Sequence, residues 1–249
     1  MEEQFYDKVA KKFGGYYTNA RYFKDFLDGD PESDFKAKLI AASGKEKIAL
    51  DIGCADGRFT LKMASNFKKI IAIDISGEML KAAQGFQKEI GVKNVSFEVQ
   101  DVEKMHFAGD FFDVAYNRRG PAEYKEFYKV LKPGGAYLEI DVAEKDTREL
   151  KEIFGRGQAF GRWDEETIER NQKELREAGF QVTFAKEYFY NEYYKSYEDL
   201  NVFLQCVPIF EDFDPEKDKK NLEKYVSEFT TEKGIKLSRH RVVIEALKK

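Results

Sequence analysis

The sequence predicts an α/β fold in which helices cover both faces of a mostly parallel sheet. Apolar runs of strand length recur, for example at residues 48–50 and 70–73, and segments with helical spacing separate them. This alternation of strands and helices is typical of parallel sheets. An acid or an amide follows several of the runs, as Asp51, Asp74 and Asn117 do. Because parallel strands bring their carboxyl ends to one edge of a sheet, we expect a ligand site at that edge.

Residues 1–45 precede the first of these strands and are predicted to begin with a helix. Phe5, Val9 and Phe13 share one face of a helix, which Gly14 would end. The aromatic residues that follow either pack onto this helix or close over a ligand. The candidates for closure are Tyr16, Tyr17, Arg21 and Tyr22.

Residues 48–60, IALDIGCADGRFT, contain a glycine turn between a strand and a helix. Gly53 and Gly57 stand on either side of Cys54, Ala55 and Asp56. A dinucleotide fingerprint would read G-x-G-x-x-G and a phosphate loop G-x-x-x-x-G-K-[ST], so the spacing fits neither. The order Asp-x-Gly-x-x-x-Gly instead resembles motif I of the class I methyltransferases that use S-adenosylmethionine (SAM). An ordinary strand–turn–helix unit is the alternative.

The resemblance continues along the chain and implies a SAM site, with S-adenosylhomocysteine as the product. In the family, the acid that ends the second strand binds the ribose, a role that falls here to Asp74. Residues 101–107, DVEKMHF, resemble the segment whose acid and following amide bind adenine, here Asp101 and Val102. Met79 is either an adenine contact or a core residue. The expected cofactor-binding residues are Asp51, Gly53, Cys54, Ala55, Gly57, Asp74, Ile75, Met79, Asp101, Val102, Asn117 and Tyr16.

The end of the fourth predicted strand faces the transferable methyl group in this family. Here residues 111–116, FFDVAY, lead into Asn117, Arg118, Arg119, Gly120 and Pro121. Enzymes that methylate the amino group of adenine or cytosine commonly carry Asn/Asp-Pro-Pro-Tyr/Phe at this place, so the sequence argues against that reaction. The two arginines indicate an anionic substrate held by a guanidinium fork. Alternatively, one arginine pairs with a carboxylate and the other is solvated.

The same resemblance implies a Rossmann-like fold whose seven-stranded, mostly parallel sheet has helices on both faces. It also implies that residues 1–45 form a helical lid that closes over the cofactor. Residues 130–140, VLKPGGAYLEI, resemble the family's turn before strand five. We expect a SAM-binding core at residues 46–188 and 236–249, with strand six at 180–189 and strand seven at 239–247. The segment between them, 189–235, is long and rich in aromatic residues. It is predicted to form a helical cap over the carboxyl edge, or alternatively a homodimer surface.

Composition limits the function classes. The chain has 249 residues and a net charge of −4, which argues against a nucleic-acid partner. Its two cysteines, Cys54 and Cys206, are far apart, so we expect both to be reduced and the protein to be cytoplasmic. The sequence shows neither the ligand spacing of a zinc site nor the apolar run of a membrane span, so we expect no metal and no membrane partner.

The predicted function is SAM-dependent methyl transfer to a small molecule that is anionic or aromatic. An RNA (rRNA or tRNA) methyltransferase and a SAM-binding protein without transferase activity are the alternatives. Methyl transfer depends mainly on positioning two atoms and excluding water, so a dedicated base is not required. The candidate catalytic residues are His106, Arg118 and Arg119, with His240 or a tyrosine of the cap as a further possible base; the candidate substrate residues are Arg118, Arg119, Tyr17 and Tyr193.

Overall fold

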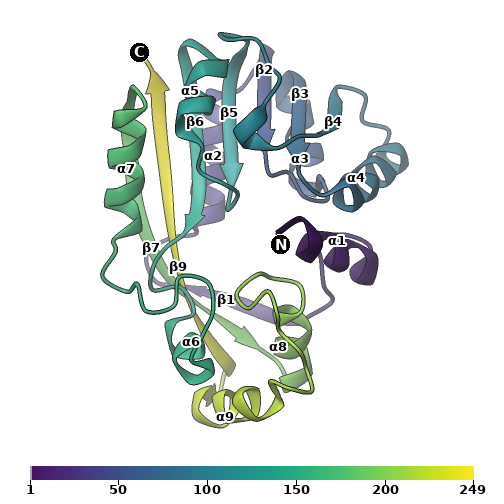
Figure 1. The fold of residues 1–249 in the computed structure, drawn as a ribbon, viewed down its shortest axis with the longest axis vertical. Coiled ribbons are helices and arrows are strands. Elements are labelled where there is room, and N and C mark those ends of the chain that lie inside the picture. Colours follow the sequence, from purple (N-terminus) through teal and green to yellow (C-terminus); the bar gives the residue numbers. More distant parts are fainter. Residues whose placement is uncertain (1) are drawn as a thin grey trace.

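One mixed sheet organises the chain, as the computed structural model of the protein shows (Figure 1). The structure describes residues 2–249, and at Glu2 the backbone alone. The strands are β1 (Tyr22–Phe26), β2 (Gly44–Ile52), β3 (Phe67–Asp74), β4 (Val95–Val99), β5 (Phe112–Arg118), β6 (Leu131–Val142), β7 (Phe180–Tyr194), β8 (Thr230–Thr231) and β9 (Gly234–Lys248). Their order is β1-β7-β9-β6-β5-β2-β3-β4, with β8 paired to β9.

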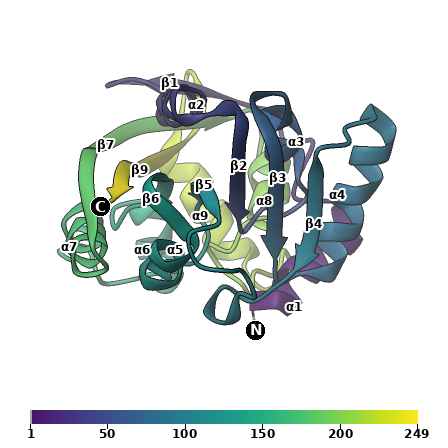
Figure 2. The same cartoon turned by 90° about the horizontal axis from the view of Figure 1, so that it is seen from above.

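The helices cover both faces of the sheet, as predicted (Figure 2). Phe35 and Leu39 of α2 pack with Val114 of β5 on one face, where α3 and α4 also lie. Phe127 of α5 and Leu175 of α7 pack with buried residues of the opposite face. The helices are α1 (Glu2–Phe13), α2 (Pro31–Ala42), α3 (Arg58–Met63), α4 (Gly77–Ile90), α5 (Tyr124–Val130), α6 (Arg148–Phe154), α7 (Thr167–Glu177), α8 (Tyr197–Leu204) and α9 (Lys219–Phe229), with short 3-10 turns at Ala64–Asn66 and Val102–Lys104.

Strand direction confirms the predicted fold class. The strands β2 to β6 pair with one another in parallel, whereas the pairs β6–β9, β9–β7 and β7–β1 are antiparallel. The predicted number of seven strands is wrong, because the described sheet contains nine. The two additional strands are β1, which pairs with the far end of β7, and the short β8.

The long ribbon of β7 and β9 corrects the predicted limits of the last two strands. The two strands remain paired from Phe180 and Lys248 to Tyr194 and Ile235, so residues 189–194 belong to the sheet and not to the cap. The alternating aromatic side chains of β7 suit a pleated strand that has neighbours to pack against. Beyond β6, the ribbon carries β1, α6, α8 and α9, which form a lower lobe in Figure 1.

This lower lobe has a core of its own and lies beyond the carboxyl ends of β2 and β5 (Figure 1). Leu150 of α6, Tyr194 of β7 and Leu200 of α8 belong to one buried cluster there. The helix α1 packs against α4, and its Phe5 and Val9 cluster with Met79 and Cys206. The carboxyl edge of the parallel strands is therefore covered by the lobe and by α1. No helix within residues 2–249 has the length and apolar content needed to span a bilayer.

Candidate functional site

The glycine turn joins the ends of β2 and β3. Gly53 has φ 67° and Ala55 has φ 47°, so the chain reverses sharply after β2. The amide of Cys54 donates to the carbonyl of Ile73 (3.0 Å), and the amide of Ala55 donates to Oδ2 of Asp74 (2.8 Å). The predicted turn residues and the predicted ribose ligand are thus neighbours in space.

Close packing explains why residue 57 is a glycine, and the sequence alone did not reveal this. A Cβ at this position would lie 2.7 Å from ring carbons of Phe97 and 2.8 Å from Ala83, and the residue has φ 67°. Only glycine therefore lets the turn approach α4 and β4 so closely.

Asp51 is a buried carboxylate at the end of β2. Its side chain is 2% exposed, and Oδ2 accepts a 2.6 Å hydrogen bond from the hydroxyl of Thr60. Burial raises the pKa of Asp51 to about 6, against the effect of the Thr60 hydrogen bond. The hydroxyl of Tyr116 points towards this carboxyl group without a hydrogen bond of ordinary geometry. A cationic ligand would stabilise the charged form of this carboxylate, which burial destabilises.

Two further acids stand at the ends of neighbouring strands. Asp74 ends β3, and its Oδ1 accepts the amide of Ser76 (2.9 Å). Asp101 follows β4 and caps the short turn that begins at Val102 by accepting the amide of Glu103 (3.0 Å). Because β3 and β4 are adjacent and parallel, the structure brings these two acids to the same edge.

The N-terminal segment lies directly on the glycine turn. The amide of Tyr16 donates to Oδ2 of Asp56 (3.0 Å), which also accepts Nε of Arg58 (3.0 Å). At the other end of the segment, the hydroxyl of Ser76 donates to Asp7 of α1 (2.6 Å). Sequence analysis predicted a lid here but gave no role to either acid. For Asp56, its place between the two glycines was a usable signal.

Asn117 holds the loop after β5. Its Oδ1 accepts the amide of Gly120 (2.8 Å) and its Nδ2 donates to the carbonyl of Pro121 (2.6 Å). The side chain is 3% exposed, and Arg119 between these contacts has φ 62°. The amide group of Asn117 therefore fixes the strained loop that carries the two arginines.

Arg118 and Arg119 share one carboxylate, that of Glu32 at the start of α2. Nη2 of Arg118 lies 2.9 Å from Oε2, and Nη1 of Arg119 contacts Oε1. The two cations hold the pKa of Glu32 well below its usual range, against the effect of its burial. Both arginines are ion-paired, in contrast to the alternative in which one was solvated, and the trio keeps one positive charge.

A second cationic cluster was missed by sequence analysis. Oδ1 of Asp146 accepts Nε of Arg239 (3.0 Å) and Nη1 of Arg241 (2.5 Å), and Glu192 accepts Nη1 of Arg239 (3.0 Å). All four side chains and Lys151 are at most 8% exposed. We call these five residues the Arg239 cluster. It combines three cations with two carboxylates, and burial lowers the pKa of Lys151.

Comparison with known proteins assigns the family. A family model described as a methyltransferase domain matches residues 43–179, more than half of the chain. The chain belongs to this methyltransferase family. The core of the methyltransferase is thus the part that carries the glycine turn and the strand-end acids.

Relatives and structural neighbours agree with this assignment. Phosphoethanolamine N-methyltransferase 3 of Arabidopsis thaliana is 30% identical over 198 residues, covering 74% of this chain and 39% of that protein. Phosphoethanolamine N-methyltransferase 1 of Zea mays is 28% identical over 92% of this chain and 44% of its own length. The chain therefore spans about two fifths of these relatives. The solved structure of the YcgJ protein of Bacillus subtilis has a TM-score of 0.64 at 18% identity, over 88% of this chain and 99% of that one, and shows the shared fold.

SAM is the methyl donor of class I methyltransferases, and the residues present fit it. The ammonium of its methionyl part suits the buried Asp51, whose charged form lacks a cationic partner at ion-pair distance within residues 2–249. Asp74 and Asp101 present carboxylate oxygens at the same edge, and such oxygens can accept hydrogen bonds from hydroxyl and amino groups. Ile75 is 39% exposed beside them. Met79 is fully buried against α1, so in this conformation the helix covers it.

Three other predicted site residues make contacts that do not involve the strand-end acids. His106 is exposed, and its amide donates to Gln100 (3.1 Å). Tyr17 is 59% exposed beside Arg58. Tyr193 stacks on Phe23 of β1 (5.2 Å between ring centroids), on the face of β7 opposite to Tyr194.

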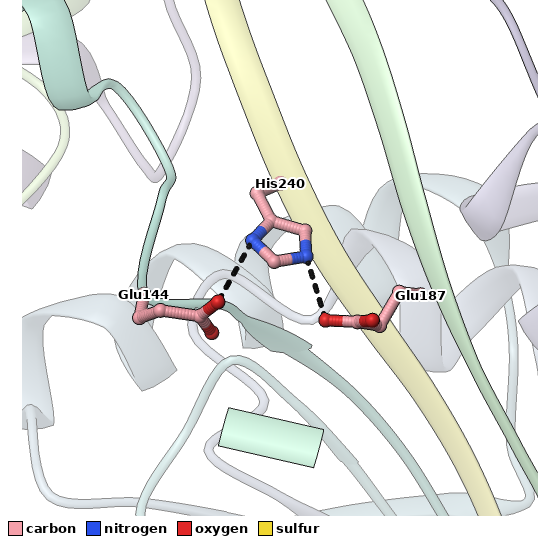
Figure 3. Close-up of side chains that lie close together, drawn as sticks. All are labelled: Glu144, Glu187 and His240. Carbon is pink, nitrogen blue, oxygen red and sulfur yellow. Dashed lines mark hydrogen bonds and ion pairs between the residues drawn. The ribbon is translucent and has the colours of Figure 1, made fainter. Parts of the chain in front are cut away.

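His240 lies between two carboxylates (Figure 3). Nε2 is 3.1 Å from Oε1 of Glu187, and Nδ1 is 3.8 Å from Oε1 of Glu144. One ligand atom from each of these three residues lies within 4.8 Å of the others, but the two carboxylates contact different ring nitrogens, as in a hydrogen-bonded histidine. As the neighbour of Arg239 on β9, His240 points to the opposite face of the sheet, away from the Arg239 cluster.

Proposed function

We propose that the chain transfers a methyl group from SAM to a small molecule that carries an anionic group. The observation that supports this is the placement of cations beyond the carboxyl edge. The charges of Arg119, Arg239 and Arg241 lower the pKa of the partly buried Tyr16 in the lid, against the larger effect of burial. Two clusters with excess positive charge thus favour an anion in the region of this tyrosine, whose amide is bonded to Asp56 of the glycine turn.

The tyrosines of this region suit the recognition of an oxyanion. Burial raises the pKa of Tyr16 and of Tyr190, so both hydroxyl groups stay protonated and can donate hydrogen bonds. Charge-assisted hydrogen bonds from guanidinium groups to a phosphate are among the strongest in proteins. The names of the relatives, phosphoethanolamine N-methyltransferases, support a phosphorylated amine as the acceptor.

In this proposal, different residues of the chain have different roles in the reaction. Asp51 and Asp74 hold the donor, Arg119 and the Arg239 cluster attract the anion of the acceptor, and the lid excludes water. Positioning of the nucleophile in line with the transferred methyl group supplies most of the rate enhancement in such a reaction. A homodimer and a cytoplasmic location stay predictions from the sequence.

The test is methyl transfer to a matched pair of acceptors. Purified protein receives labelled SAM with either phosphoethanolamine or ethanolamine, which differ only in the phosphate group. We expect labelled product with the first and at least about tenfold less with the second, because the phosphate supplies the charge-assisted contacts. Equal labelling of both acceptors would contradict the proposed role of the cations.

A further inference from the structure

We infer that Arg118 is a cofactor ligand: its guanidinium group binds the carboxylate of the methionyl end of SAM, while Arg119 serves the acceptor. The inference rests on the use of SAM proposed above. It gives different roles to two neighbouring arginines that sequence analysis had assigned together to the substrate.

Arg118 and Asp51 lie on one face of the sheet, at the ends of neighbouring strands. Asp51 is the register partner of Tyr116, and Arg118 follows Tyr116 by two residues along β5. Residues two apart in a strand point to the same face, so all three side chains do. The charge of Arg118 opposes the rise that burial gives to the pKa of Asp51, which requires the two groups to be close.

The opposite charges of Arg118 and Asp51 are nevertheless not paired with each other. In the described part of the chain, Arg118 is ion-paired with Glu32 and Asp51 is hydrogen-bonded to Thr60. No ion pair of 4.0 Å or less joins Arg118 to Asp51 within residues 2–249. The carboxylate and the guanidinium group therefore lie on the same face of neighbouring strand ends without pairing with each other.

One buried donor of Arg118 has no partner among residues 2–249. Its Nη2 donates to Glu32 (2.9 Å), and its guanidinium plane lies over the ring of Phe59 (4.1 Å to the centroid). These two contacts fix the orientation of the group, yet Nε is buried and has no hydrogen-bond partner within residues 2–249. Buried donors are nearly always paired, so a missing partner points to a ligand.

The opposite charges of Asp51 and Arg118 match the two charged groups of an α-amino acid. Such a group carries an ammonium and a carboxylate on one carbon atom, and SAM ends in one. Asp51 suits the ammonium, and the free Nε of Arg118 suits the carboxylate. Arg119 is placed differently, because its charge acts on Tyr16 and Tyr190 of the proposed acceptor region.

The test compares two nucleosides that differ by one carboxylate. S-adenosylhomocysteine contains the amino-acid end, and S-adenosyl-3-thiopropylamine is the same molecule without the carboxylate. Calorimetric titration gives the dissociation constant of each for the wild-type protein, Arg118→Met and the matched control Arg119→Met. Methionine keeps an apolar side chain over Phe59.

We expect Arg118→Met to weaken binding of S-adenosylhomocysteine by about tenfold or more and to leave binding of the decarboxylated nucleoside within about twofold, since one charge-assisted contact is lost. Retained binding of the decarboxylated nucleoside also shows that the variant is folded. Arg119→Met should bind both as the wild type does. If Arg118→Met weakens both nucleosides equally, or neither, the inference is overturned while the proposed function stands. If the wild-type protein binds neither nucleoside, the proposed function fails as well.

Discussion

The backbone amide of Tyr16 donates a 3.0 Å hydrogen bond to Oδ2 of Asp56, which joins the N-terminal lid to the glycine turn. Asp56 is 5% exposed and also holds Arg58, so one carboxylate connects the lid, the turn and α3. A Cβ at Gly15 would lie 2.8 Å from the same oxygen, which shows how closely the lid approaches.

Replacement of Asp56 should loosen the lid without unfolding the core. In Asp56→Ala the amide of Tyr16 and the side chain of Arg58 lose their acceptor. We expect faster amide hydrogen exchange across residues 2–17 and about tenfold weaker binding of S-adenosylhomocysteine, since hydrogen bonds to charged groups contribute about 1.5–3 kcal/mol. Unchanged exchange in residues 2–17 would show that Asp56 does not hold the lid.

Asp51 should make the ligand-free protein less stable as the pH rises. Its pKa is raised from 3.8 to about 6, so between these values the folded state binds more protons than the unfolded state. The free energy of unfolding therefore falls with rising pH across this window, by up to about 3 kcal/mol. Asp51→Asn should lose this part of the pH dependence and be at least as stable as the wild type at pH 7. Thermal melts of both proteins from pH 4 to 7 measure the difference, and parallel curves would contradict the assignment.

Gly57→Ala should destabilise the fold. The new methyl group would meet Phe97 at 2.7 Å, and alanine is strained at φ 67°. We expect a loss of roughly 2–4 kcal/mol from these two effects, measured by urea denaturation. Gly77→Ala is the matched control, since its Cβ has no neighbour within 4 Å and its φ is not positive. Equal stability of both variants would be inconsistent with the packing described.

The Arg239 cluster should be sensitive to the loss of a single carboxylate. In Asp146→Asn the buried Arg239 and Arg241 lose the charge that pairs them. Removal of one partner from a buried ion pair costs about 3–5 kcal/mol. The control Lys217→Ala removes an exposed pair with Asp214 and should change stability by less than about 1 kcal/mol. A small effect of Asp146→Asn in the same denaturation experiment would show that the cluster is more open to solvent than described.

The features that could be predicted from the sequence are those that depend on residues close together along the chain. The period of the apolar residues gave the parallel strands and their helices, and strand-end position gave Asp51, Asp74 and Asp101. The strand β1 was missed because its partner in β7 lies far along the chain, at Tyr190–Tyr194. Glu32 is separated from Arg118 by 86 residues, so nothing local connects the two.

The most direct test of the central claim is the fate of labelled methyl groups in an extract of the cell that makes the protein. The extract is incubated with the purified protein and labelled SAM and is then separated by molecular mass. We expect label in the low-mass fraction, and we expect this label to be lost with the variants Asp51→Asn and Asp74→Asn. Label in a fraction that ribonuclease destroys would contradict the account and make the protein an RNA methyltransferase.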